Sequence, residues 1–330
     1  MSCYHPLPAY KSKFLNPETG KNVIRFNLVD PDPSKWEPIM LPCGQCIGCR
    51  IDYSRQWANR CMLELQSHDS AFFCTFTYDD DHVPRSFYSD PETGEAIPSL
   101  TLSKRDFQLL MKRIRKRFPD DRIRFFACGE YGSQTFRPHY HAILFGLHLD
   151  DLRPYKTVRL GDQLYIYYNS DKLQSCWLDS DGNPIGFVVV GEVTWESCAY
   201  TARYIMKKLK GKEADFYEKH NILPEFTLMS RRPGIARDYY GSHPKLFDSD
   251  FICISTPNGG RKFRPPRYFE KLFEIDEPMK ARELREVKKR LALEAQKSKL
   301  RKTSLELHEL LAVEEQNFTD RIKPLRRPLL

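Results

Sequence analysis

The middle of the chain contains segments with helix-like and strand-like hydrophobic patterns in turn. Residues 51–66 favour a helix, and residues 71–78, which are rich in aromatic and β-branched side chains, favour a strand. Ser103 is a suitable N-cap for a second helix that we expect to continue to about Phe118. Its apolar positions recur at helical spacing and are Phe107, Leu110, Met111 and Ile114.

Three more strands and a helix follow. Residues 123–128 and 139–146 predict two strands separated by a short connection. A polar insertion occupies about 149–184, after which residues 186–193 predict a buried strand and residues 196–210 a helix. This order of strands and helices is typical of an α+β fold with an antiparallel sheet.

Both ends of the chain differ from the middle. Residues 1–50 are rich in proline and predict irregular structure, and residues 85–100 predict a loop. From about Asp276 onward the pattern is that of a charged helical stretch without a long heptad repeat. We therefore expect a Cys-rich N-terminal segment before the core of residues 51–275, and a basic helical tail at 276–330.

Charge is distributed unevenly along the sequence. The chain has 52 Lys and Arg against 44 Asp and Glu, a net charge of +8. The excess is concentrated in residues 280–302, 104–124 and 200–212. Such clustering favours a polyanionic partner, above all nucleic acid, although solvated helix faces also collect charge.

Composition narrows the class of protein. With 330 residues and 41% hydrophobic residues, the chain can form a packed core and is not wholly disordered. No apolar run approaches the ~20 residues of a membrane-spanning helix, and the N-terminus lacks a signal-peptide core. We expect neither a secreted nor a membrane protein, so the ten cysteines are free thiols or metal ligands in a reducing cytoplasm. Six of them show no ligand spacing and are expected in the core: Cys61, Cys74, Cys128, Cys176, Cys198 and Cys253.

His139 and His141 are the strongest candidates for metal ligands. Side chains at i and i+2 leave a strand on the same face, so both imidazoles can point at one ion while Tyr140 faces away. Glu130 ends the preceding predicted strand, and a hairpin would bring its carboxylate beside them. Two histidines and a carboxylate suit Mg²⁺ or Mn²⁺ when a phosphate completes the shell. The alternative is that the histidines are structural and Glu130 is an exposed strand-end carboxylate.

Tyr200 and Tyr204 are the candidate nucleophiles. They lie four residues apart on the predicted helix, and Lys207 continues the same stripe. A tyrosine stripe is often core packing, but this one leads into cations that include Lys207 and Lys208. Phenolic hydroxyls beside ammonium groups can attack phosphorus and form a covalent phosphotyrosine. Such an intermediate conserves the energy of the cleaved bond, so rejoining needs no nucleotide.

Cys43, Cys46 and Cys49 form a CxxCxxC pattern, to which Cys3 can add a fourth thiolate. Four thiolates can hold a structural zinc ion, Zn²⁺, in a closed site. The tight spacing is also similar to some iron–sulfur ligation, and scattered free thiols are the remaining alternative.

The ordered set of motifs resembles the HUH endonucleases that initiate rolling-circle replication, and more narrowly the replication initiators of microviruses of the gokushovirus type. The matching segments are CGQCIGCR at 43–50, FCTFTY at 73–78, GEYG at 129–132, RPHYH at 137–141, YTARY at 200–204 with Lys207 and Lys208, and MSRRPGI at 229–235. The resemblance covers about residues 3 to 270.

The resemblance implies an antiparallel sheet flanked by helices and a metal-dependent nicking activity. His139 and His141 would be the two histidines of the HUH motif, Glu130 the third ligand, and Tyr200 and Tyr204 the paired tyrosines. The implied partners are single-stranded origin DNA and the host helicase and polymerase, in the cytoplasm of a bacterial host. The sequence departs from the family pattern in having a tyrosine, not an aliphatic residue, between the two histidines.

Two other functions remain open at this point. One is a related HUH transposase or relaxase that uses a single tyrosine. The other is a non-catalytic, basic protein that binds or packages nucleic acid. The segment 280–302 can bind DNA phosphates or another protein, or be a solvated helix. No Gly-Lys-Ser/Thr nucleotide-binding loop is present, so no helicase activity is expected from this chain.

Overall fold

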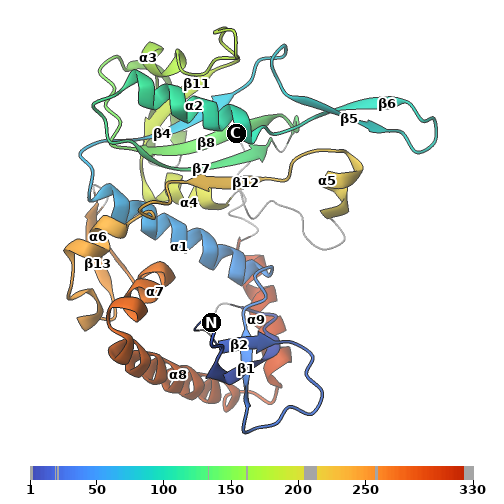
Figure 1. Ribbon diagram of the computed structural model, residues 1–330, viewed down its shortest axis with the longest axis vertical. Helices are drawn as coiled ribbons and strands as arrows, with labels where there is room; N and C mark the ends of the chain where they lie inside the picture. The colour runs from blue at the N-terminus through green and yellow to red at the C-terminus, as the bar shows by residue number, and fades with distance from the viewer. Residues whose placement is uncertain are drawn as a thin grey trace. The chain divides into compact units, whose positions relative to one another are not determined.

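The computed structural model describes residues 3–18, 20, 22–132, 134–160, 163–203, 214–256 and 259–322. The chain divides into two compact units (Figure 1). The central unit is Tyr53–Pro278, and the terminal unit consists of Met1–Asp52 and Met279–Leu330. The two ends of the chain, which the sequence analysis treats as separate segments, therefore belong to one unit. Within the described ranges, no helix has the length and apolar character that crossing a lipid bilayer requires.

The central unit is built on an antiparallel sheet, as the strand pattern predicts. Its seven described strands follow the order β12-β7-β8-β4-β11-β10-β9. Their bounds are β12 Phe226–Met229, β7 Arg124–Tyr131, β8 Pro138–Phe145, β4 Ala71–Thr77, β11 Val188–Glu192, β10 Gln163–Asn169 and β9 Arg153–Leu160. β7 and β8 are almost entirely buried, which fits their central position in the sheet. The predicted α+β class is confirmed.

Helices cover both faces of this sheet (Figure 1). On one face lies α2 (Lys104–Arg117), whose N-cap Ser103 accepts a hydrogen bond from the Asp106 N–H, together with α3 (Asp171–Gln174). The expected apolar stripe of α2 is buried there. The opposite face packs against α1 (Ile47–Leu65), α4 (Trp195–Arg203) and α6 (Arg237–Ser242). The sheet therefore separates two apolar clusters.

Three stretches contain strands that the sequence analysis does not predict. Residues 1–50 were expected to be irregular, but β1 (Leu7–Leu15), β2 (Asn22–Arg25) and β3 (Trp36–Leu41) form an antiparallel sheet in the order β2-β1-β3. The expected loop at 85–100 is the hairpin of β5 (Arg85–Ser89) and β6 (Ala96–Leu100). These predictions were wrong because strands exposed on both faces lack the alternation of apolar and polar residues that marks a half-buried strand.

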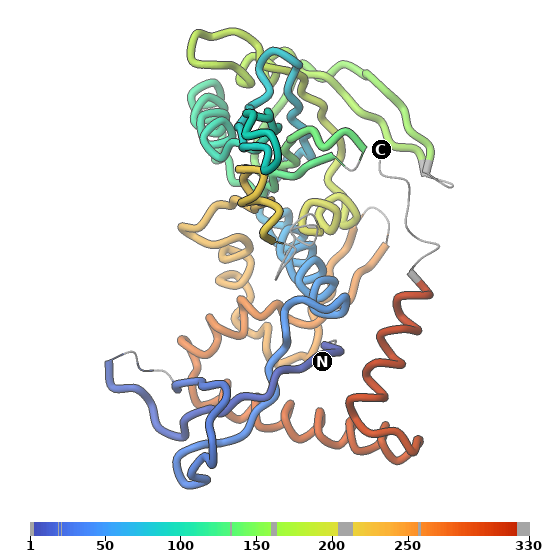
Figure 2. The backbone as a smooth tube through the Cα atoms, turned by 90° about the vertical axis from the view of Figure 1, so that its right-hand side faces the viewer, coloured from blue at the N-terminus to red at the C-terminus, as the bar shows by residue number. Residues whose placement is uncertain are grey.

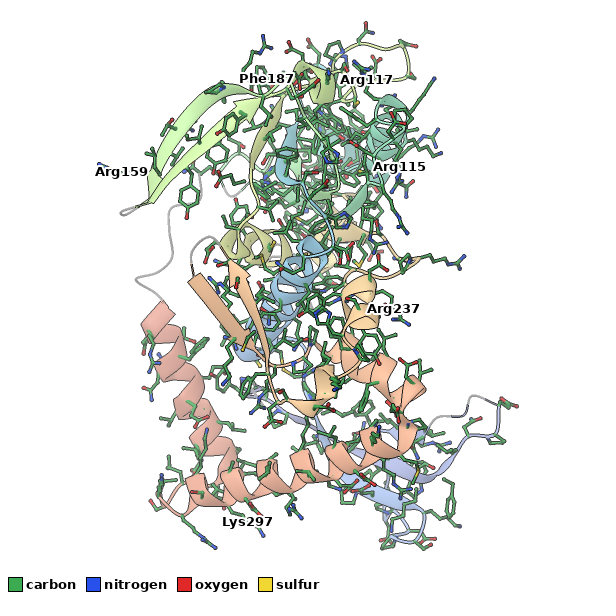
Figure 3. All side chains as sticks on the ribbon, turned by 90° about the vertical axis from the view of Figure 1, so that its left-hand side faces the viewer. Arg115, Arg117, Arg159, Phe187, Arg237 and Lys297 are labelled. Atoms are coloured by element: carbon green, nitrogen blue, oxygen red, sulfur yellow. The ribbon has the colours of Figure 1, made fainter. Side chains whose placement is uncertain are left out.

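The polar insertion at 149–184 supplies the third unexpected pair. β9 and β10 form a ribbon that extends beyond the other strands (Figure 2), with Arg159 near its tip (Figure 3). Exposed side chains dominate β9, so its hydrophobic pattern is weak. The strands therefore had no signal in the pattern from which the core strands were predicted.

The remaining elements follow the sheet in the sequence. They are α5 (Asp215–Lys219), η3 (Leu246–Asp248), β13 (Ile252–Thr256), β14 (Gly259–Phe263), α7 (Arg267–Asp276), α8 (Pro278–Leu300) and α9 (Leu307–Ile322). The helical tail is therefore confirmed. Cys253 was expected in the core, but it is exposed because alternate residues of β13 point outward.

The backbone of Gly186 approaches β4 very closely. Its φ is +153°, and a Cβ added there would lie 1.9 Å from the carbonyl oxygen of Thr77. Gly182 also has a positive φ, +90°, but a Cβ there would have no neighbour within 4 Å. Gly186→Ala is therefore expected to lower the free energy of unfolding by about 2 kcal/mol more than Gly182→Ala. Urea denaturation of the two variants measures the difference, and equal losses would contradict the prediction.

Candidate active site

Three potential metal ligands converge on β7 and β8. The two strands pair antiparallel with Glu130 directly opposite His139, and Cys128 opposite His141. The Oε1 atom of Glu130 lies 2.7 Å from Nε2 of His139 and 3.0 Å from Nε2 of His141. The hairpin therefore brings the three side chains together on one face of the sheet, as the sequence analysis expects.

The Glu130 carboxylate is stabilised in its charged form. Its residue is only 1% exposed, and burial by itself would raise the pKa of the carboxyl group. Hydrogen bonds from His139 and His141 outweigh burial and lower the pKa to about 2. Glu130 is thus a buried anion facing two imidazoles.

These donors fit a small divalent cation. One ligand atom from each of the three residues lies within 4.8 Å of the others. Neighbouring ligands of an octahedral ion at ~2.1 Å are roughly 3.0 Å apart, which matches the distances from Oε1 to the two Nε2 atoms. Two imidazoles and one carboxylate leave further coordination positions for substrate oxygens. The site has the donor set for Mg²⁺ or Mn²⁺, and the geometry does not identify the ion.

The ring nitrogens that face away from Glu130 have partners of their own. Nδ1 of His139 donates to the carbonyl oxygen of Arg137 at 3.1 Å, and Nδ1 of His141 lies 2.9 Å from Oγ1 of Thr75. With Nδ1 protonated, the lone pair of each Nε2 is directed toward Glu130. Such partners orient metal-binding histidines in many proteins. The sequence analysis missed Thr75, because its role depends on the register in which Thr75 of β4 pairs with His141 of β8.

Tyr200 lies beside this group of ligands. It is carried by α4, and its ring centroid is 5.2 Å from that of His141 and 6.2 Å from that of Phe73. Burial raises the pKa of the Tyr200 phenol, and the negative charge of Glu130 raises it further, whereas Arg203 opposes the shift. The phenol is therefore protonated at neutral pH until a positive charge approaches.

Tyr140 occupies the opposite face of β8, as expected. Its hydroxyl donates to the Ser103 carbonyl oxygen at 2.8 Å and accepts from the Ser103 N–H at 2.9 Å. Tyr140 is fully buried among residues that include Phe107. The departure from the family pattern at this position therefore leaves the ligand face unchanged, since the ring packs on the other side of the sheet.

Three expected catalytic residues cannot be placed. Tyr204, Lys207 and Lys208 lie outside the described residues, which end at Arg203 and resume at 214. Their predicted roles stay predictions.

The expected cysteine site also comes together, in the terminal unit. The sulfur atoms of Cys3, Cys43, Cys46 and Cys49 all lie within 4.8 Å of one another, and all four are free thiols. Burial disfavours the thiolate of Cys43, but N–H groups of Cys46 and Gln45 outweigh it and lower its pKa to about 7. The grouping fits a metal site better than scattered free thiols.

Comparison with known proteins gives consistent matches. A family model described as a replication-associated protein of the ORF2 type matches residues 71–209, the segment that contains the three ligands and Tyr200. No solved structure matches the chain.

Curated relatives come from three phages. Replication-associated protein ORF2 of Spiroplasma virus 4 is 31% identical over 281 residues, covering 83% of this chain and 81% of that protein. Replication-associated protein VP4 of Bdellovibrio phage phiMH2K is 29% identical, covering 72% of this chain and 69% of its own. Replication-associated protein ORF4 of Chlamydia phage 1 is 30% identical, covering 70% and 53% respectively.

Thr75→Val tests whether the hydroxyl orients His141. The substitution keeps the shape of the side chain but removes the partner of Nδ1, so affinity for Mn²⁺ is expected to fall about 10-fold to 100-fold. Isothermal titration calorimetry measures the change. Thr75→Ser should restore binding. Thr77→Val is the matched control, because the Thr77 hydroxyl donates to the Phe187 carbonyl. Unchanged affinity in Thr75→Val would remove this role.

Proposed function

We propose, from the premise that this chain belongs to the family of phage replication-associated proteins, that it initiates rolling-circle replication by nicking and rejoining single-stranded origin DNA. The observation that carries the proposal is the convergence of Glu130, His139 and His141 next to the ring of Tyr200. These are the ligands and the nucleophile that a metal-dependent tyrosine endonuclease requires.

Glu130, His139 and His141 would hold Mg²⁺ or Mn²⁺. When bound, such an ion polarises a phosphodiester and stabilises negative charge on phosphate and phenolate oxygens. The protein's contribution is to direct both Nε2 atoms and Oε1 of Glu130 at one point and to shield them from water, since Glu130 and His141 are buried. His139 is the more exposed ligand, so substrate is expected to enter from its side.

Tyr200 would act on the scissile phosphate. Its phenolic oxygen forms a bond to phosphorus as the bond from phosphorus to O3′ breaks, and the phenolic proton is lost while O3′ leaves as a hydroxyl. The products are a 5′-phosphotyrosyl link and a free 3′-hydroxyl, which a host polymerase can extend. Attack of a 3′-hydroxyl on that link reverses the step and rejoins the strand.

Tyr204, Lys207 and Lys208 complete the proposal on the strength of the family resemblance. Tyr204 would cleave the regenerated origin after one round, so that two phenols alternate. Lys207 and Lys208 would neutralise charge on the phosphate or the phenolate. The matched family segment, 71–209, includes all three positions.

Basic surfaces support a nucleic-acid partner. Arg115 and Arg117 project from the exposed side of α2, and Lys297 projects from α8 (Figure 3). Phosphate contacts of this kind provide affinity without sequence specificity. The host helicase and polymerase, and the cytoplasm of the bacterial host, follow from the proposed role.

Trapping the covalent intermediate tests the central step. Incubation with Mn²⁺ and single-stranded fragments covering the phage genome should give a protein–DNA adduct on denaturing electrophoresis, and EDTA should abolish it. The double variant Tyr200→Phe with Tyr204→Phe should form no adduct, whereas Tyr155→Phe, at an exposed tyrosine of β9, should behave as the native chain.

The same experiment separates the alternatives. Adducts that persist in either single variant support two nucleophiles. Complete loss in one single variant would favour a one-tyrosine transposase or relaxase. DNA binding without any adduct would favour a packaging protein and would contradict the nicking proposal.

The exposed basic residues of α8 should contribute to DNA affinity. Replacing Arg290 and Lys297 with Gln removes two cations, so the plot of log affinity against log salt should become shallower by about 1.4, at ~0.7 per contact with single-stranded DNA. Fluorescence anisotropy at several salt concentrations measures the slope. The charge-preserving pair Arg290→Lys and Lys297→Arg is the control, and an unchanged slope in the Gln variant would exclude this contact.

A further inference from the structure

The N-terminal part of the terminal unit has almost no hydrophobic core. Among the described residues from 3 to 46, the buried apolar side chains are Cys3, Ala9 and Cys46. Phe14 is 65% exposed and Val29 is 93% exposed. A sheet of three short strands requires an apolar face or another stabilising interaction to persist in water. Apolar burial therefore does not account for the order of β1, β2 and β3.

The four thiols near this sheet have the spacing of ligands around a single ion. The sulfurs of Cys43 and Cys49 are 4.0 Å apart, as are those of Cys3 and Cys46. Tetrahedral ligands at ~2.3 Å from zinc lie about 3.8 Å from one another. An iron–sulfur cluster has to fit several ions between its thiolates and needs them farther apart. The spacing thus favours one tetrahedral ion.

Backbone N–H groups are directed at these sulfurs. Within the described residues, the donor and acceptor pairs are Gln45 and Cys46 to Cys43, at 3.4 and 3.3 Å, Tyr4 and Cys49 to Cys46, at 3.4 and 3.5 Å, and Cys43 to Cys3, at 3.2 Å. α1 begins at Ile47, so the positive end of its dipole also faces the group. Gly44, with φ of +72°, makes the turn that directs two of these donors. Thiolates, which carry negative charge, are stabilised by such donors.

We propose that the terminal unit binds one zinc ion through Cys3, Cys43, Cys46 and Cys49, and that this ion ties β1–β3 to the start of α1. Four thiolate ligands close the coordination shell, so the role is structural and not catalytic. Zinc is favoured over ferrous iron because it binds such sites more tightly. Each thiol that binds releases its proton to solvent. The proposal is independent of the nicking activity.

The ion would also stabilise a contact between the two ends of the chain. Tyr4 and His5 follow Cys3 directly. The Tyr4 ring lies 6.2 Å from that of Phe318, and His5 pairs with Glu315, both on α9. Releasing Cys3 would therefore free the start of β1 and loosen its contacts with α9.

Metal analysis of the full-length chain tests the identity of the ion. Protein purified without chelators should contain one zinc per chain by inductively coupled plasma mass spectrometry. Exchange with Co²⁺ should give the intense visible bands of a tetrahedral thiolate complex. Iron in place of zinc, or zinc far below one per chain after growth with added zinc, would overturn the proposal.

Variants test the ligands. Cys46→Ser and Cys49→Ser should lose zinc, whereas Cys253→Ser, at an exposed cysteine of β13, should retain it. Cys46→His should retain zinc with an altered Co²⁺ spectrum, which separates ligand loss from misfolding. A combined His139→Ala and His141→Ala variant should also keep the zinc, so the two metal sites are distinguished. Full zinc content in Cys46→Ser would contradict the ligand assignment.

Hydrogen exchange tests the structural role. Removal of zinc from the native chain should accelerate exchange in β1–β3 and α9 at least 10-fold, and leave β7 and β8 unchanged. If zinc removal leaves β1–β3 equally protected, the ion does not stabilise this sheet.

Discussion

A buried carboxylate between two imidazoles is the interaction on which the centre of this protein depends. Glu130 is almost inaccessible to solvent, and a buried carboxylate without partners costs several kcal/mol. The register of β7 against β8 has to keep Glu130 opposite His139. Because a slip by one residue turns every side chain to the other face, it would separate the carboxylate from both histidines. The same requirement therefore specifies the sheet and assembles the ligands.

The two faces of β8 have different tasks. His139 and His141 lie on one face, while Tyr140 between them is fixed on the other by both backbone groups of Ser103. Ser103 also caps α2, so the start of that helix is linked to the strand that carries the ligands. This connection explains how a polar site is held rigidly at the end of an otherwise apolar strand. It also explains why a tyrosine is compatible with this position, since its hydroxyl is fully satisfied.

Much of the central unit could be predicted from the sequence. The apolar spacing of α2, the aromatic content of β4 and the period of two that places both histidines on one face are local properties. Exposed pairs such as β5–β6 and β9–β10 escaped prediction, because strands without a buried face leave no hydrophobic period. Cys253 was assigned to the core because composition alone does not show which side of β13 faces water.

The sequence by itself determined which residue types are available for chemistry: a histidine pair, a carboxylate nearby, a tyrosine on a helix and a CxxCxxC motif. Only the tertiary structure decided which of them meet. Thr75 reaches His141 through the pairing of β4 with β8, Tyr200 reaches it through the packing of α4, and Cys3 joins three cysteines about 40 residues away through the folding of β1–β3. Spacing along a chain fixes neighbours within one helix or strand, but contacts between elements depend on register and packing, which no local pattern contains.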